Sequence, residues 1–114
     1  MREGSVILTP ILQADGQSKN RPAVILREMP LHGDFFVCGI TTQLHHYVDG
    51  FDEIISSTDP DFEASGLREE SLVRLGFLAM VPRHRILGLI GEILSERHSR
   101  LLRKLSDYLI ADLS

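Results

Sequence analysis

The sequence predicts a mainly β (α+β) fold that ends in one α-helix. Up to about residue 94 the chain consists of short apolar runs separated by turn-forming residues, which is typical of an all-β core. Only after Ser95 do leucines recur at helical spacing. The chain has 114 residues, of which 43% are hydrophobic and 25% charged. It is long enough to form one core, so we expect a single domain over residues 1–114.

Three apolar runs early in the chain predict strands, at residues 5–8, 22–26 and 35–40. Thr9-Pro10 ends the first strand or marks a sheet edge, because proline has no N–H to donate to a neighbouring strand. The polar stretch 15–20 is predicted to be a loop. The third run is almost continuously hydrophobic, which predicts burial on both of its faces.

Later strand signals are weaker and fall at residues 53–55, 71–75 and 85–94. The last run carries Gly88 and Gly91, each of which costs a helix about 1 kcal/mol relative to alanine, so a strand is favoured there. An amphipathic helix is predicted from about Ser95, a candidate N-cap residue, to Ala111. The leucines near helical spacing are Leu101, Leu102, Leu105, Leu109 and Leu113.

Charges are segregated along the chain, although the formal net charge is only −4. Residues 49–70 contain eight acidic residues and one basic residue, Arg68, whereas basic residues dominate 83–104. Such a chain can present one basic face to a polyanion and an acidic face to solvent. The alternative is that the basic and acidic faces are both merely solvated and bind no partner.

The N-terminal residues lack the apolar core of a signal peptide, and no apolar run approaches the roughly 20 residues needed to span a bilayer. These features predict a soluble, cytoplasmic protein. The lone cysteine, Cys38, lies inside an apolar run, where a small buried hydrophobe is favoured over a catalytic thiol.

Lys19-Asn20-Arg21-Pro22 and Gly39-Ile40-Thr41-Thr42-Gln43 belong to an ordered series of motifs. This series resembles that of the PemK/MazF toxins of type II toxin–antitoxin systems. The similarity covers about residues 4–110. It implies an SH3-like β-barrel with a C-terminal α-helix, assembled as a homodimer. It also implies an endoribonuclease of the RNA interferase type, which cleaves single-stranded RNA and is neutralised by a cognate antitoxin protein.

The resemblance places the catalytic residues at Arg21 and Thr41. Cleavage by the ribose 2′-OH passes through a phosphorane with extra negative charge, to which a guanidinium can donate two parallel hydrogen bonds. Arg21 is expected to stabilise that charge rather than to act as a base, because an arginine side chain keeps its proton near neutral pH. Thr41 is expected to position a phosphate oxygen or the attacking hydroxyl. The alternatives are an ion pair between Arg21 and Asp15 and a strand-end hydrogen bond of Thr41.

Five further residues are candidates for substrate binding: Lys19, Asn20, Thr42, Gln43 and Arg74. Arg74 matches an arginine of PemK-type members that place an acid two positions later, where this chain has Gly76. Which group acts as the acid–base partner of the catalytic residues is therefore an open question. His45 and His46 could supply a base, because histidine titrates near neutral pH, or could form an exposed loop pair.

The spacing of histidine, cysteine and carboxylate residues does not resemble a zinc site, and no glycine-rich phosphate loop is present. We therefore expect neither a metal nor a nucleotide cofactor, and predict metal-independent cleavage by 2′-OH attack. The alternative function is a non-catalytic toxin or adaptor on the same fold, which either poisons a target such as gyrase or binds RNA without cleaving it.

Overall fold

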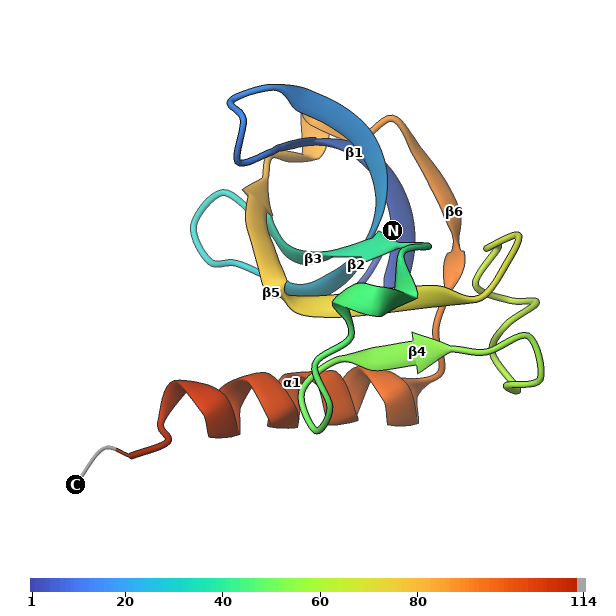
Figure 1. Ribbon diagram of the computed structural model, residues 1–114. Helices are drawn as coiled ribbons and strands as arrows, with labels where there is room; N and C mark the ends of the chain where they lie inside the picture. The colour runs from blue at the N-terminus through green and yellow to red at the C-terminus, as the bar shows by residue number, and fades with distance from the viewer. Residues whose placement is uncertain (113–114) are drawn as a thin grey trace.

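A six-stranded antiparallel sheet curls into a half-barrel in the computed structural model, which describes residues 1–112 (Figure 1). The strand order is β4-β5-β3-β2-β1-β6, and α1 packs across the outside of the curl (Figure 1). The predicted mainly β fold with a C-terminal helix is confirmed. The elements are β1 (Ser5–Leu12), β2 (Ser18–Glu28), β3 (Phe35–Thr41), η1 (Leu44–His46), β4 (Glu53–Ile55), β5 (Ser71–Val81), η2 (Arg83–Arg85), β6 (Gly88–Glu92) and α1 (Ser95–Leu109).

Apolar side chains pack on both faces of the sheet. The cluster that includes Leu101 of α1 contains Val24 and Cys38, whereas the second cluster contains Ile25 and Val37. Because neighbouring residues of β3 alternate between the two clusters, the predicted burial of this strand on both faces is confirmed. Burial raises the pKa of the Cys38 thiol to about 12, so Cys38 is the small buried hydrophobe expected from the sequence.

The β1–β2 hairpin extends further into the polar sequence than predicted. β1 continues to Leu12 and β2 begins at Ser18, so the predicted loop at 15–20 is wrong for its last three residues. Backbone pairing continues here because it does not require apolar side chains. Pro10 lies beyond the residues of β1 that pair with β6, so β6 does not pair with β1 at this position. This agrees with the prediction that Pro10 marks a sheet edge.

β5 is longer than the predicted strand at 71–75 and contains a bulge. Gly39 of β3 pairs with Arg74, whereas the preceding residue Cys38 pairs with Leu78. Residues 75–77 therefore bulge out of the β3–β5 ladder. The bulge allows β5 to bend around the half-barrel and continue beyond its predicted end.

A buried carboxylate, that of Asp52, supports this bulge. It accepts hydrogen bonds from the backbone N–H groups of Leu75 and Val48, each at 3.0 Å. The contact satisfies the N–H of Leu75 at the bulge. It also connects the loop that follows η1 to β5.

The segment before β5 lies directly on β6. β6 occupies the centre of the predicted strand at 85–94, while Arg83–Arg85 form a short 3-10 helix instead. A Cβ at Gly91 would clash with the backbone of Ala64 and Ser65, and one at Gly66 with that of Ile90. Gly91, one of the two glycines that disfavoured a helix, and Gly66 thus allow the two backbones to touch.

α1 ends two residues before the predicted limit and buries Leu101 and Leu105. Its N-cap is Leu94 rather than Ser95, because the carboxylate of Asp61 accepts the Leu94 N–H at 3.2 Å and replaces a local cap. Leu113, the last leucine of the helical pattern, lies outside the described residues. No helix within residues 1–112 combines the length and apolar character needed to cross a membrane.

The basic and acidic segments meet inside the fold at Arg97. Its guanidinium contacts the carboxylates of Glu53 at 2.9 Å, Asp59 at 2.9 Å and Asp61 at 2.8 Å. Only 8% of the Arg97 side chain is exposed. This cluster, called here the ionic cluster, also includes contacts of Arg100 and Lys104 with Glu53.

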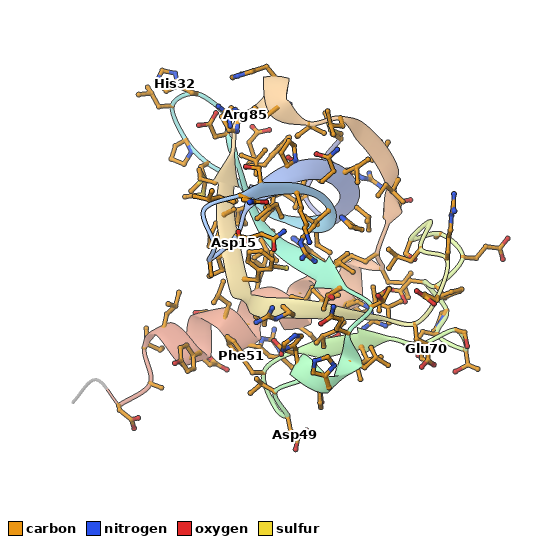
Figure 2. All side chains as sticks on the ribbon, turned by 45° about the horizontal axis from the view of Figure 1, so that its top comes forward. Asp15, His32, Asp49, Phe51, Glu70 and Arg85 are labelled. Atoms are coloured by element: carbon orange, nitrogen blue, oxygen red, sulfur yellow. The ribbon has the colours of Figure 1, made fainter. Side chains whose placement is uncertain are left out.

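The ionic cluster corrects the expected separation of charge into a basic face and an acidic face. Three basic residues of α1 are used to hold β4 and the following acidic segment, because opposite charges attract strongly away from water. Exposed acids of the segment 49–70 remain, and Figure 2 shows two of them, Asp49 and Glu70, in the lower part of the view, with His32 and Arg85 in the upper part.

Candidate functional site

Two adjoining hollows open where β2 and β3 meet the segment before β5. The first, called here the outer groove, has a volume of about 650 Å³ and is bordered on one side by residues 66–69. The second, the inner hollow, has a volume of about 350 Å³ and reaches the bulge of β5. Arg21, Thr41 and Gln43 line both, so the hollows meet at the two residues expected to be catalytic.

All seven residues predicted to form the site line these hollows. Lys19, Asn20 and Thr42 line the outer groove, Arg74 lines the inner hollow, and Arg21, Thr41 and Gln43 line both. They come from three strands and from the residues that follow β3.

The sheet register brings Arg21 and Thr41 together. Ala23 pairs with Gly39, and the same register continued by two residues sets Arg21 opposite Thr41. Arg21 is the fourth residue of β2 and pairs with Thr9 of β1, so its expected position at a loop–strand junction is wrong. Its backbone is held within the sheet, which fixes where the side chain begins.

The guanidinium of Arg21 has unused hydrogen-bond donors. Its Nε is buried without a hydrogen-bond partner among residues 1–112, and its Cζ lies 5.9 Å from the centre of the Phe77 ring. The alternative ion pair with Asp15 does not form within these residues. Asp15, labelled in Figure 2, accepts the Gln17 N–H at 2.9 Å instead. Arg21 can therefore receive an incoming anion.

The bulge of β5 brings Arg74 to the same aromatic ring. The Arg74 Cζ lies 5.6 Å from the centre of the Phe77 ring, on which Arg21 also packs. Phe77 fits there because Gly39 has no side chain: a Cβ at Gly39 would lie 2.8 Å from the ring. Two cationic side chains are thus gathered around one ring at the inner hollow.

The hydroxyl of Thr41 is oriented by the backbone. Its Oγ1 accepts the Gln43 N–H at 3.1 Å, which is the strand-end hydrogen bond considered as an alternative. This bond uses the oxygen as acceptor and leaves the hydroxyl hydrogen available to a ligand. A structural bond and a role in binding are therefore compatible at Thr41.

His46 lines the inner hollow, whereas its neighbour His45 lines neither hollow. The Nε2 of His46 lies 3.2 Å from Oε1 of Gln43, and the two imidazole rings pack with their centres 4.3 Å apart. Desolvation, followed by the charges of His45 and Arg74, lowers the pKa of His46. Both rings are exposed as expected of a loop pair, but only His46 reaches the site.

The net charge of the hollows is positive. In the part of the chain that the structure describes, Lys19, Arg21, Arg68 and Arg74 form no ion pair, and Glu69 is the acid that lines the outer groove. Within the same residues, no group of three or more histidine, cysteine or carboxylate side chains is arranged to hold a metal ion. The site suits an anionic ligand.

Sequence reasoning missed Gln13, Phe77 and Arg68 as lining residues. Phe77 follows the predicted end of its strand, and Arg68 was noticed only as the single base in an acidic segment. The side-chain Nε2 of Gln13 is buried without a hydrogen-bond partner among residues 1–112, as is the Nε of Arg21. A signal for Phe77 existed in Gly39, since a glycine inside a buried strand often marks a close approach.

Comparison with known proteins places this architecture in a family. The family model described as "PemK-like, MazF-like toxin of type II toxin-antitoxin system" matches residues 2–109. The solved structure of the Mycobacterium tuberculosis toxin MazF-mt6 has a TM-score of 0.67 and 20% sequence identity, covering 95% of this chain and 98% of that chain, and shares its fold. No curated protein sequence matches the chain. Because the family match spans nearly the whole chain and includes the strands that carry Arg21 and Thr41, this protein belongs to the PemK/MazF-like toxins of type II toxin–antitoxin systems.

Proposed function

We propose that this toxin is an endoribonuclease that cleaves single-stranded RNA by attack of the ribose 2′-OH, without a metal ion. The observation that carries the proposal is the state of Arg21. Its Nε is buried and unpartnered among residues 1–112, at the junction of two positively charged hollows. A phosphodiester supplies acceptor oxygens for these donors, and its cleavage adds negative charge where they point.

Each site residue has a role in this reaction. Arg21 stabilises the phosphorane, and Arg74, which also packs against the Phe77 ring, adds a second cation. The Thr41 hydroxyl donates to a phosphate oxygen or orients the 2′-OH. Lys19, Asn20, Thr42 and Gln43 hold the flanking nucleotides along the outer groove. RNA supplies its own nucleophile, so the protein needs no covalent intermediate.

Membership in the family implies a cognate antitoxin. We infer that its acidic and apolar segment folds onto the hollows and competes with RNA for Arg21 and its neighbours. We also infer that the toxin is cytoplasmic and that it forms a homodimer. The outer groove of one copy is short, so a longer path for RNA needs two copies. Light scattering at tens of micromolar should show a dimer, and RNA and antitoxin should weaken each other's binding.

The deciding experiment incubates the purified toxin with a long single-stranded RNA in EDTA and maps the new ends. We expect fragments with a 2′,3′-cyclic phosphate and a free 5′-OH, and no cleavage where the target nucleotide carries a 2′-deoxyribose. A 5′-phosphate product or a metal requirement would overturn the mechanism. RNA that stays intact would favour a non-catalytic toxin, either an RNA binder or a gyrase poison, and a topoisomerase assay separates these two.

A further inference from the structure

The proposed reaction needs a group that accepts a proton from the 2′-OH. The guanidinium groups of Arg21 and Arg74 cannot do so, because an arginine side chain keeps its proton near neutral pH. Among residues 1–112, no carboxylate lines the inner hollow, and Gly76 is exposed at the bulge of β5. The lining side chain with a suitable titration range is the imidazole of His46.

The position of His46 connects it to Thr41. His46 ends η1, which begins three residues after Thr41, and its Nε2 lies 3.2 Å from Oε1 of Gln43. The backbone N–H of Gln43 in turn donates to Thr41 Oγ1. An amide oxygen only accepts hydrogen bonds, so this contact favours the tautomer with hydrogen on Nε2 and a free lone pair on Nδ1. Gln43 thus orients the base as well as lining the site.

The surroundings of His46 favour its neutral form. The groups around it are cationic or neutral: His45 from η1, Arg74 from β5 and Arg21 from β2, which lines the same hollow. Desolvation and then the charges of His45 and Arg74 lower the pKa of His46, so at pH 7 the imidazole is in the form that can accept a proton.

The acids that follow η1, Asp49 and Asp52, line neither hollow. Asp49 accepts a hydrogen bond from the Tyr47 hydroxyl at 3.2 Å, and Asp52 accepts the N–H groups of Val48 and Leu75. Through these contacts Asp52 also ties the loop after His46 to the strand that carries Arg74.

We propose that His46 is the general base of this toxin, an inference that rests on the proposed ribonuclease function. Nδ1 takes the proton of the 2′-OH as the O2′–P bond forms and the P–O5′ bond breaks. The departing 5′ oxygen takes a proton from solvent, and the imidazolium afterwards returns its proton to solvent. The reaction leaves the cyclic phosphate and the 5′-OH with no other reactant consumed.

The test compares single-turnover cleavage rates from pH 5 to 8 for the natural protein, His46→Gln and the control His84→Gln, which changes an exposed histidine of η2 outside both hollows. We expect His46→Gln to lower the rate by about 10²-fold and to abolish the rise of the rate with pH, while RNA affinity and thermal stability hardly change. His84→Gln should keep both the rate and the pH profile. His45→Gln removes a neighbouring charge and should shift the pH-dependent rise to higher pH without removing it.

The outcomes separate the two proposals. If the natural protein cleaves RNA and His46→Gln keeps the same pH profile, His46 is not the base and the ribonuclease function stands. If the natural protein leaves RNA intact, both proposals fail. Added imidazole should restore part of the activity of His46→Ala, because a small base can enter the exposed position. Absence of such rescue, together with a retained pH profile, would assign His46 a structural role.

Discussion

Two arginines in this protein have opposite surroundings. Arg97 in the ionic cluster is buried and contacts Glu53, Asp59 and Asp61. Arg21 is half-buried at the hollows, and among residues 1–112 its Nε has no hydrogen-bond partner and its guanidinium has no carboxylate partner. The difference shows that burial alone does not distinguish the two arginines. The carboxylate partners of Arg97 make it structural, whereas Arg21, without such partners, is available to a ligand.

The difference also explains how an acidic chain can present a cationic site. The acids that give the chain its charge of −4 are concentrated in residues 49–70, and several of them are neutralised by α1. Of the acids in residues 49–70, Glu69 lines the outer groove and none lines the inner hollow, where Arg21 and Arg74 share the Phe77 ring. Net charge therefore says little about the local potential.

The largest effect is expected for Arg97→Ala. It leaves Asp59 and Asp61 without a cationic partner and Glu53 with only Arg100 and Lys104, which should lower the free energy of unfolding by about 3–5 kcal/mol. Urea unfolding monitored by circular dichroism measures it. Arg21→Ala serves as the matched control and should change stability by less than about 1 kcal/mol. Equal losses in the two variants would contradict the distinction between the arginines.

The second effect concerns the reaction. Arg21→Ala should lower the cleavage rate on the order of 10²-fold or more, because it removes stabilisation of charge that develops in the transition state. RNA binding, measured by fluorescence anisotropy, should weaken far less. Arg97→Ala, assayed under conditions where it remains folded, should keep most of its activity. Full activity of Arg21→Ala would reject the proposed mechanism.

A smaller effect is expected for Thr41→Ala. If Thr41 only orients the substrate, losing one hydrogen bond of roughly 1 kcal/mol lowers the rate by about fivefold to tenfold. Thr42→Ala, next to it in the outer groove, is the comparison and should affect RNA affinity more than the rate of the chemical step. A loss for Thr41→Ala that exceeds the loss for Arg21→Ala would mean that Thr41 does more than orient the RNA.

The smallest effect is expected when the pH falls from 7 to 5. Burial alone would raise the pKa values of Glu53 and Asp61. Hydrogen bonds from Arg100 and Lys104 nevertheless lower the pKa of Glu53 below its ordinary value of 4.5. Hydrogen bonds from Arg97 likewise lower the pKa of Asp61 below its ordinary value of 3.8. The stability that these acids contribute is complete above those values and is lost as the pH falls through the lowered values. Unfolding free energies should therefore be similar at pH 7 and 5 and decline below about pH 4.5. Because the pKa of His46 is also lowered, protonation of His46 removes a little stability over this range, so a decline at pH 6 that persists in His46→Gln would contradict the cluster.

Local patterns in the sequence predicted where most elements begin. The alternation and burial of β3, the short strand Glu53–Ile55 and the start of α1 follow from apolar periodicity, which acts over a few residues. The motif resemblance placed seven site residues that the structure brings together. Their roles stay predictions. The ends of β1, β2 and β5 were wrong because strand pairing extends elements beyond their apolar centres.

The sequence by itself therefore determined the mainly β class, the terminal helix and the residue types available to the site. Only the tertiary structure decided which arginine is paired and which is free, because ion pairs such as that of Arg97 with Glu53 join residues far apart in the chain. It also decided that the β5 bulge opposite Gly39 brings Arg74 and Phe77 to Arg21, and that His46 reaches the same hollow. Bulges and register depend on the neighbouring strand, so no local pattern encodes them.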